Sequence, residues 1–329
     1  MNDQRIKLLR LVEILRADTD EAHPLTTTQL CQRLNAYGIS CDRRTLSDDM
    51  AFLNRSGFEV MDCRVGHAKG YYMVDRSFSD PELKVLIDAV QAASFITEGK
   101  TAELTDKIAS LGGSHRADIL RTNLVHFNTR KHTNETFLYS ISALEQALLD
   151  GVQVSFLYFD LDEHHHRVLR HDGQRQVVQP VALIYSGATY YLLCYAPTHE
   201  DRRATYRIDR MQQVRAEKEP VSREAIAARA TVSDYTGQTF DMYSGVPKKI
   251  TLQFERHALG AIYDAFGEDL DVFLGPRGSL QAIVTVRVSP TFWGWLFTFH
   301  GDVRIVEPED LLEEYRGLLD AQRKLYRRK

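Results

Sequence analysis

The sequence contains no run of about 18 apolar residues, the length that a membrane-spanning helix requires. Its first fifteen residues form an amphipathic pattern with internal charges, which a secretory signal peptide does not have. Cysteine is scarce too. The chain has four cysteines, which lie far apart along the sequence and form no Cys-x-x-Cys pair. Such cysteines are typical of free thiols in a reducing compartment. We therefore expect a cytoplasmic protein without membrane contacts.

Motifs that carry enzyme chemistry are missing as well. There is no Gly-x-Ser-x-Gly, no His-Glu-x-x-His, no P-loop and no pair of acids within one motif. The glycines near Gly187 are too few to cradle a nucleotide. Three adjacent histidines, His164 to His166, lie among acids, but successive side chains of a loop rarely point at one ion. We therefore expect no enzyme activity, no metal and no cofactor, and interpret residues 160–175 as a polar loop.

The length of 329 residues predicts two or three domains, and a hydrophobic content of 43% is sufficient for their cores. A net charge of −4 gives the whole chain no electrostatic preference for nucleic acid. The charge is unevenly distributed, however. Residues 202–215 carry five arginines against one aspartate, and residues 320–329 carry five basic residues against one acid.

Residues 1–75 have the pattern of a winged helix-turn-helix DNA-binding domain. Apolar periodicity predicts a helix over residues 4–16, a second over about 28–36 that a run of three threonines can cap, and a third over 43–55. Strand-like runs separated by glycines follow up to Val74 and predict a hairpin, or wing.

The third of these helices is the predicted reading helix. Its residues Leu46, Met50 and Leu53 share the core face, and Arg44 and Arg55 lie opposite. The predicted contacts with duplex DNA are Thr27, Thr28, Arg43, Arg44, Thr45, Ser47, Arg55 and Lys69. An ordinary three-helix bundle with solvated arginines is the alternative, because three aspartates bring the net charge of this helix near zero.

Residues 76–135 are predicted as a helical connector. The tetrad Ser79 to Glu82 combines an N-cap, an early proline and a capping-box glutamate, which is a strong helix start. This helix is predicted to continue through Phe95 and Ile96. Two further helices follow, and residues 123–134 are predicted as a polar loop. The connector is interpreted either as a packing arm between two domains or as a passive spacer.

Residues 136–215 are predicted as a helix, capped by Asn134 and ended by Gly151, followed by an antiparallel sheet or small barrel. Its strands are expected over 152–158, 176–185, 189–195 and 204–214. If the last of these is a continuous strand, Arg207 and Arg210 point to opposite faces. Arginines fixed near a tyrosine-rich strand indicate an anion site, and the alternative is a solvated edge strand with an Arg-Asp pair.

The remaining residues are predicted as a linker over 216–247 and a last domain over 248–329. The order of strands and helices in the last domain is βαββαβ, which is typical of a ferredoxin-like fold. Its aromatic residues are expected to form either a dimer interface or the core of the domain itself. The predicted fold class is thus a multidomain α+β protein.

Several of these motifs resemble the WYL-domain family of bacterial transcription regulators, whose domain is a small Sm/SH3-like barrel. The resemblance rests on Pro180, Leu183, Gly187, the triplet Tyr190-Tyr191-Leu192 and the run Tyr206 to Met211. Tyr190 stands where the family has tryptophan. Arg43 to Leu46 followed by Asp49-Met50 is similar to the winged helices that precede WYL domains, although Asp48 replaces the usual arginine. The last domain resembles the C-terminal extension of the family.

The resemblance implies a homodimeric, ligand-responsive regulator that binds a double-stranded DNA operator. It also implies an anionic effector, either a nucleotide or a single-stranded nucleic-acid fragment. The implied ligand-binding residues are Tyr158, His171, Arg175, Ser186, Tyr191, Arg203, Arg207, Asp209 and Arg210. Of these, Arg207 is the expected direct contact, and Arg210 is either a second contact or a structural link. The alternatives are a nucleic-acid-processing or single-strand-binding protein and an adaptor that responds to a small molecule.

Overall fold

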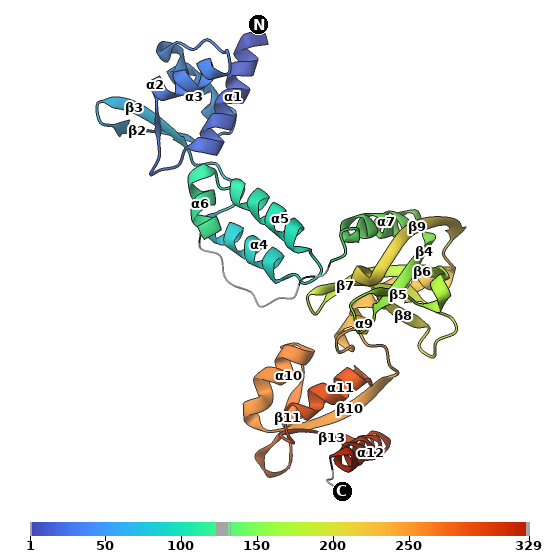
Figure 1. The fold of residues 1–329 in the computed structure, drawn as a ribbon. Helices are drawn as coiled ribbons and strands as arrows, with labels where there is room; N and C mark the ends of the chain where they lie inside the picture. Colours follow the sequence, from blue (N-terminus) through green and yellow to red (C-terminus); the bar gives the residue numbers. More distant parts are fainter. Residues whose placement is uncertain (1, 123–130, 132, 327–329) are drawn as a thin grey trace. The chain divides into compact units, whose positions relative to one another are not determined.

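The computed structural model describes residues 2–122, 131 and 133–326, which belong to two units, Met1–Thr133 and Asn134–Lys329 (Figure 1). Within the part of the chain that the structure describes, none of the helices combines the length and the hydrophobicity that a membrane span requires.

The first unit begins with a head of three helices and a three-stranded antiparallel sheet of order β1-β3-β2. Its elements are α1 (Asn2–Asp18), β1 (Leu25–Thr26), α2 (Thr27–Ala36), α3 (Arg43–Arg55), β2 (Val60–Val65) and β3 (Ala68–Met73). Thr26 caps α2 in a capping box with Gln29. The predicted helices and hairpin are confirmed, with the bounds of α3 as predicted, and the pairing of β1 with β3 is an addition.

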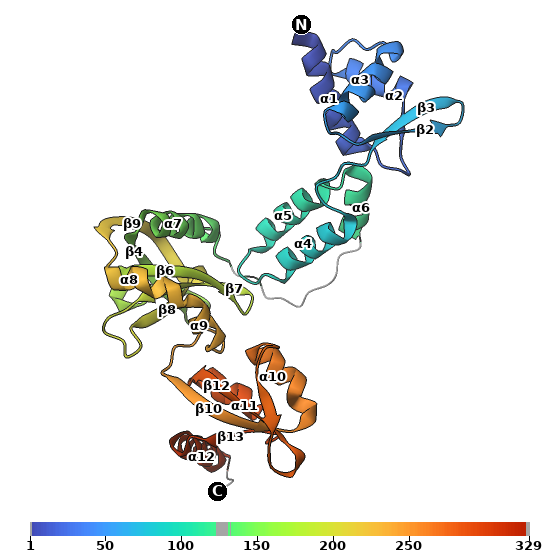
Figure 2. The same ribbon diagram turned by 180° about the vertical axis from the view of Figure 1, so that it is seen from behind.

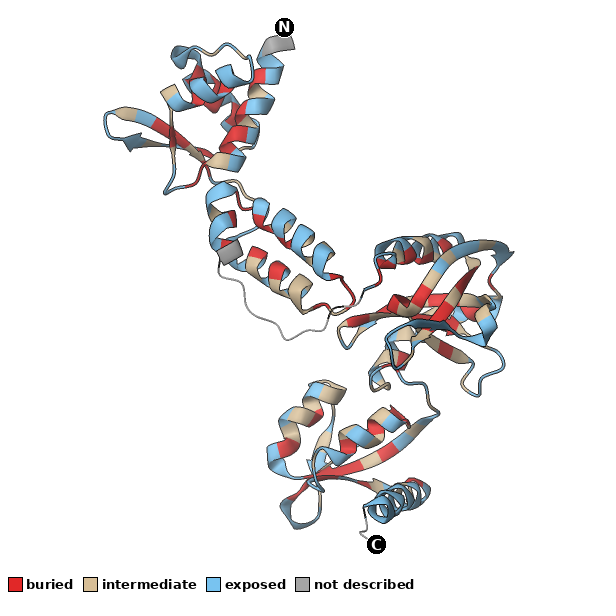
Figure 3. Cartoon of the chain, viewed as in Figure 1, coloured by how far each residue is buried: buried red, intermediate tan, exposed pale blue. Residues whose placement is uncertain are grey.

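The head has one apolar core, because each helix turns a single leucine-rich stripe inward (Figure 3). Leu11, Leu30 and Leu46, one from each helix, are completely buried, and Met73 of β3 closes the core from the sheet. The opposite face of α3 is exposed, as its periodicity predicted.

Three helices complete the first unit: α4 (Asp80–Ala92), α5 (Glu98–Ser110) and α6 (Ser114–Thr122). The predicted capping box is confirmed, since the Ser79 amide donates to Glu82 at 2.7 Å. The expected continuation of α4 through Phe95 and Ile96 is wrong, because these residues are buried in the connection before Thr97, which caps α5. Most of the predicted loop 123–134 lies outside the described residues.

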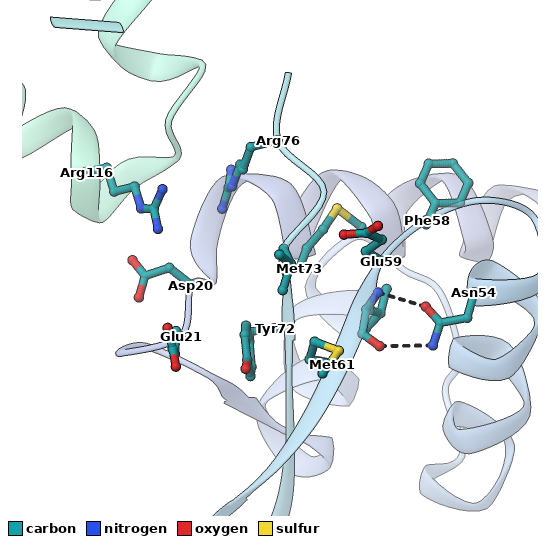
Figure 4. Close-up of a pocket in the computed structure, with 12 residues that line it drawn as sticks. Asp20, Glu21, Asn54, Phe58, Glu59, Met61, Tyr72, Met73, Arg76 and Arg116 are labelled. Atoms are coloured by element: carbon teal, nitrogen blue, oxygen red, sulfur yellow. Dashed lines mark hydrogen bonds between the residues drawn. The ribbon is translucent and has the colours of Figure 1, made fainter. Parts of the chain in front are cut away.

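This helical segment is fixed to the head by polar and ring contacts. Arg76, which follows β3, donates to the backbone carbonyls of Arg16 and Thr19 at the end of α1. His23 of the head stacks on His115 of α6 with ring centroids 3.8 Å apart. Beside these contacts lies a cleft of about 480 Å³, bordered by Arg76, Arg116 and Asp20 (Figure 4). The segment therefore packs on the head.

The second unit begins with α7 and a curved antiparallel sheet of order β5-β4-β6-β7-β8, with β9 paired to β4. The elements are α7 (Phe137–Asp150), β4 (Val152–Leu161), β5 (Arg167–Leu169), β6 (Gln176–Ser186), β7 (Thr189–Tyr195), β8 (Arg203–Arg207) and β9 (Met211–Pro220). Gly151 ends α7 in the left-handed conformation (φ 67°), as predicted from its position. The sheet confirms the predicted antiparallel class.

Two predictions for this part of the chain, one for the sheet and one for the start of α7, are wrong. The expected strand 204–214 is interrupted by a 3-10 turn, η2 (Ile208–Arg210), after which the chain joins β4 instead of continuing along β7. The N-cap of α7 is Thr136 and not Asn134, which lies two positions earlier and accepts from the amide (3.2 Å) and hydroxyl (2.8 Å) of Thr136. The Asn134 amide group donates to the carbonyls of Asp209 (3.0 Å) and Met211 (3.1 Å) and holds the η2 turn in place.

Two short helices, α8 (Arg223–Ala228) and α9 (Val232–Gly237), occupy the predicted linker, and β9 runs to Pro220 across the expected boundary at residue 215. Seen from behind, α8 lies across β6 (Figure 2). Because Tyr235 of α9 is fully buried against the sheet, this segment packs as part of the sheet's core.

The chain ends in a four-stranded antiparallel sheet of order β11-β12-β10-β13 with three helices. The elements are β10 (Pro247–Phe254), α10 (Leu259–Phe266), β11 (Val272–Leu274), β12 (Leu280–Arg287), α11 (Pro290–Phe297), β13 (Val303–Glu307) and α12 (Glu309–Leu325). The predicted βαββαβ order is confirmed. The aromatic residues Phe292 and Trp295 of α11 pack against this domain's own core. In contrast, α12 is exposed along most of its length (Figure 3).

Candidate functional site

The exposed face of α3 is the first candidate site. Arg43, Arg44, Ser47 and Arg55 all project from it into solvent. The carboxylate of Asp42 caps the helix by accepting from the Arg44 amide at 3.0 Å, which orients the first turn. This face therefore presents three guanidinium groups and a hydroxyl from one rigid helix.

The aspartates that were expected to cancel this charge are differently placed. Asp49 points inward, where its carboxylate lies 2.6 Å from the Lys7 ammonium, and both side chains are 6% exposed. Asp42 and Asp48 stay exposed, so the outer face carries three arginines against two acids. Burial of Asp49 beside Lys7 therefore leaves this face with one net positive charge, although the net charge of the helix with its cap is near zero, as predicted. The partner Lys7, 42 positions away, gave no signal in the sequence.

Two of the remaining predicted DNA contacts, Thr45 and Lys69, are bonded to other residues of the protein. The Thr45 hydroxyl donates to the Asp42 carbonyl (2.9 Å) and accepts from Lys7 (3.0 Å). Lys69 on the hairpin pairs with Asp62 at 3.2 Å, which raises the pKa of its ammonium. Thr27 and Thr28 open α2, and Thr28 borders a cleft of about 560 Å³ together with Arg43 and Arg44. The structure thus brings Thr28 beside the first turn of α3.

The second candidate site is a charged cluster on the curved sheet of the second unit. Asp160 at the end of β4 receives two hydrogen bonds from Arg170 (2.5 and 3.0 Å) and one from Arg210 (3.1 Å). The Arg170 guanidinium also lies 5.1 Å from the ring centre of Tyr158. The arginine bonds hold the pKa of Asp160 below its ordinary value, so this carboxylate stays ionised. The three side chains are partly exposed and together carry one net positive charge.

Arg207 and Asp209 lie deeper beside this cluster. Arg207 donates to both oxygens of Asp209 (3.1 and 2.9 Å), whose side chain is completely buried. The Arg207 amide donates to the Tyr158 hydroxyl at 3.1 Å, and Tyr191 is its partner in the β7–β8 register. Burial raises the pKa of both tyrosines. The Arg-Asp pair that the sequence left as an alternative is therefore present, and it forms because η2 turns Asp209 back toward Arg207.

Four predicted ligand residues are placed outside this cluster. Arg175 donates to Ser155 and to the carbonyl of Gln213. Arg203 donates to Thr231, and His171 and Ser186 lie in or beside turns. Asp160 and Arg170 were missed, because residues 160–175 were interpreted as a polar loop. The short run Arg167 to Arg170 could have indicated these two residues. It forms β5, which pairs with β4 and brings Arg170 to Asp160.

Arg203 belongs to a further cluster, which joins the curved sheet to the last domain. Arg287 of β12 donates to Asp201 at 2.8 Å and to the carbonyl of Gly245 at 2.9 Å. The guanidinium groups of Arg287 and Arg203 lie 4.4 and 4.9 Å from the ring centre of Tyr235. The side chains of Arg287 and Asp201 are only 7% and 10% exposed.

Comparisons with known families agree with this architecture. Residues 140–216 match the family model of the WYL domain, and residues 247–321 match that of the WCX domain. The second unit therefore carries a WYL domain followed by a WCX domain, which confirms the resemblance seen in the sequence. No curated protein matches the chain.

Among solved structures, the chain is similar to the proteasome accessory factor B/C (PafBC) of Arthrobacter aurescens. The two share 21% sequence identity over 98% of this chain and 49% of that one, with a TM-score of 0.30. The chain thus spans about half the length of that protein.

Proposed function

We propose that the protein is a cytoplasmic, ligand-responsive transcription regulator that binds duplex DNA through α3 and an anionic effector through its WYL domain. The observation that carries the proposal is the net positive, solvent-facing side of α3 in a chain that also has WYL and WCX domains. A helix that presents arginines from its first turn is suited to phosphate and base contacts in the major groove.

The finer fold assignments are part of this proposal. Three helices followed by a hairpin support a winged helix-turn-helix head. The curved sheet β4–β9 supports an Sm/SH3-like barrel, and the strand order β11-β12-β10-β13 supports a ferredoxin-like last domain. In each case the strand order and the helix positions supply the support.

Replacing Arg44 and Ser47 together with alanine is expected to weaken operator binding roughly 5- to 150-fold, the loss that one good base contact of about 1–3 kcal/mol produces. Genomic fragments selected by the purified protein supply the operator, and a gel shift measures the affinity. Arg5→Ala, an exposed arginine on α1, is the charge-matched control. Equal affinity of the double variant and the control, both with wild-type melting temperature, would contradict the assignment of α3.

The charged cluster supports an anionic effector. Arg170 and Arg210 share a single carboxylate, so a phosphate placed beside them would gain charge-assisted hydrogen bonds without displacing a buried partner. That the effector is derived from nucleic acid rests on the resemblance to the WYL family. Titration with an oligonucleotide, a mononucleotide and inorganic phosphate separates this proposal from an adaptor that responds to other small molecules.

Homodimer formation through α12 is the third part of the proposal. A groove of about 920 Å³ runs between α11 and α12 and is lined by apolar side chains that include Trp293, Tyr315, Leu318 and Leu319. The first turn of α12 is acidic and its last turn is basic, so two copies packed antiparallel would place unlike charges together. A regulator that reads two half-sites also requires two heads.

Leu318→Asp is expected to raise the dimer dissociation constant about a hundredfold, because a carboxylate would be buried without a partner. Light scattering across a concentration series measures the change. Leu149→Asp, an exposed position of α7, is the matched control and should stay dimeric. A Leu318→Asp protein that dimerises as well as the control would exclude this groove as the interface.

A nucleic-acid-processing or single-strand-binding protein is the alternative that the arginine cluster also supports. We propose that the protein has no enzyme activity. Incubation of labelled single-stranded and duplex DNA with the protein and Mg²⁺ or Mn²⁺ tests this, and cleavage that α3 variants leave unchanged would favour the alternative.

A further inference from the structure

Two of the four cysteines meet at the turn before α3. Cys31 lies on α2 and Cys41 directly precedes Asp42, and their Sγ atoms are 2.9 Å apart. That separation exceeds a disulfide bond by only about 0.9 Å. The sequence indicated separate thiols, because the two cysteines lie ten positions apart and form no Cys-x-x-Cys motif. The turn between α2 and α3 brings them together.

The pair is also reachable from solvent. Cys31 is buried, but Cys41 is half-buried and both line the 560 Å³ cleft that Arg43 and Arg44 border. A small molecule in this cleft would therefore contact Cys41 first and find Cys31 behind it. Attack at the outer thiol and resolution by the inner one is the arrangement that a reversible disulfide requires.

We propose that Cys31 and Cys41 form a redox-active dithiol whose oxidation to a disulfide changes the position of the first turn of α3. The effect on DNA rests on the proposed function, whereas formation of the disulfide does not. The oxidant is a low-molecular-weight disulfide, RSSR.

The reaction balances as two successive exchanges. The Cys41 thiol loses a proton, and its sulfur attacks one sulfur of RSSR, which forms a mixed disulfide and releases one thiolate RS⁻. The Cys31 thiol then loses its proton and attacks the Cys41 sulfur, which breaks the mixed disulfide and releases the second RS⁻. Two electrons pass to RSSR, and the two protons yield two RSH.

The surroundings of Cys41 make this exchange slow near neutral pH. Burial and the adjacent Cys31 raise the pKa of Cys41 to about 12, with smaller opposing contributions from Lys7, which lowers it, and Asp49, which raises it. Asp42, Arg43 and Arg44 are the charged neighbours along the chain and in the cleft. Because a raised pKa leaves less thiolate at pH 7, the exchange should accelerate steadily as the pH rises toward 12. The pair is thus suited to sustained oxidising conditions rather than to brief exposure.

The position of Cys41 connects the disulfide to α3. Asp42 accepts from the Arg44 amide through its side chain and from the Thr45 amide (3.2 Å) through its carbonyl. Drawing the Cys41 sulfur onto Cys31 pulls on the residue next to this cap. The cap positions Arg43 and Arg44, so its movement displaces the side chains that we assign to DNA.

The first test is chemical and uses the full-length protein with oxidised glutathione at pH 8. Trypsin cleaves after Arg33, between the two cysteines, so the disulfide would join peptides 17–33 and 34–43, which separate after reduction. We expect this cross-linked species, together with loss of two of the four thiols and their recovery with dithiothreitol. Cys63→Ser should behave as wild type. Retention of four thiols, or pairing through Cys63 or Cys194, would overturn the proposal.

The second test measures binding of selected operator DNA by reduced and oxidised protein. We expect oxidation to weaken binding at least about fivefold, the effect of losing one base contact. Cys41→Ser should bind DNA equally well with and without glutathione, whereas Cys31→Ser, which lacks the resolving thiol, should keep glutathione on Cys41 and give that adduct by mass instead of the cross-linked peptides. If the cross-link forms but the affinity is unchanged, the link to α3 is wrong. If neither state binds any DNA, the proposed function fails while the dithiol stands on the peptide map.

Discussion

Replacing Arg287 with alanine is expected to lower the free energy of unfolding of the second unit by about 3–5 kcal/mol, the cost of breaking a buried ion pair. The loss is large because Asp201 would stay buried without its partner and the carbonyl of Gly245 would lose a charged donor. The ring of Tyr235 would also lose one of its two cations.

Urea denaturation followed by tryptophan fluorescence measures this change, because both tryptophans of the chain, Trp293 and Trp295, lie on α11 of the same unit. Arg316→Ala is the matched control: its pair with Glu309 is about two-thirds exposed, and its removal should cost about 0.5 kcal/mol or less. A double-mutant cycle with Asp201→Ala isolates the pair. A loss below about 1 kcal/mol would show that this pair does not stabilise the junction.

Replacing Arg170 and Arg210 together with alanine is expected to reduce affinity for an anionic effector at least about a hundredfold. Each guanidinium would give a charge-assisted hydrogen bond worth roughly 1.5–3 kcal/mol. The fold should tolerate the change, because Asp160 is partly exposed and water can replace its two partners. Anisotropy of a labelled oligonucleotide, together with calorimetric titration of a mononucleotide, measures the affinity.

Arg215→Ala, an exposed arginine of β9, is the charge-matched control and should bind the effector like wild type. Arg207→Ala is a poor probe, because it would strand the buried carboxylate of Asp209 and lower the stability of the domain itself. Equal binding by the double variant and the control would place the effector elsewhere on the protein.

Features set by near neighbours in the chain were predictable from the sequence. The bounds of α3, the capping box at Ser79 and the end of α7 at Gly151 each depend on residues within one helical turn. The βαββαβ order of the last domain likewise follows from apolar periods and the glycines between them. In these regions, local conformational preference and the tertiary fold favour the same structure.

Contacts between distant residues were decided by the tertiary structure. Lys7 removes Asp49 from the surface of α3, and Asn134 holds the turn that breaks the predicted strand at Ile208. Each of these partners acts across more than 40 positions, where periodicity carries no information.

The same limit applies to the sites. Arg210 meets Asp160 across 50 positions, and Cys31 meets Cys41 through a turn whose path no spacing rule defines. The sequence by itself determined which helices and strands form and which residue types they carry. Only the packing of those elements decided which charges are buried in pairs and which remain available to a ligand, because a charge leaves water only where folding supplies its partner.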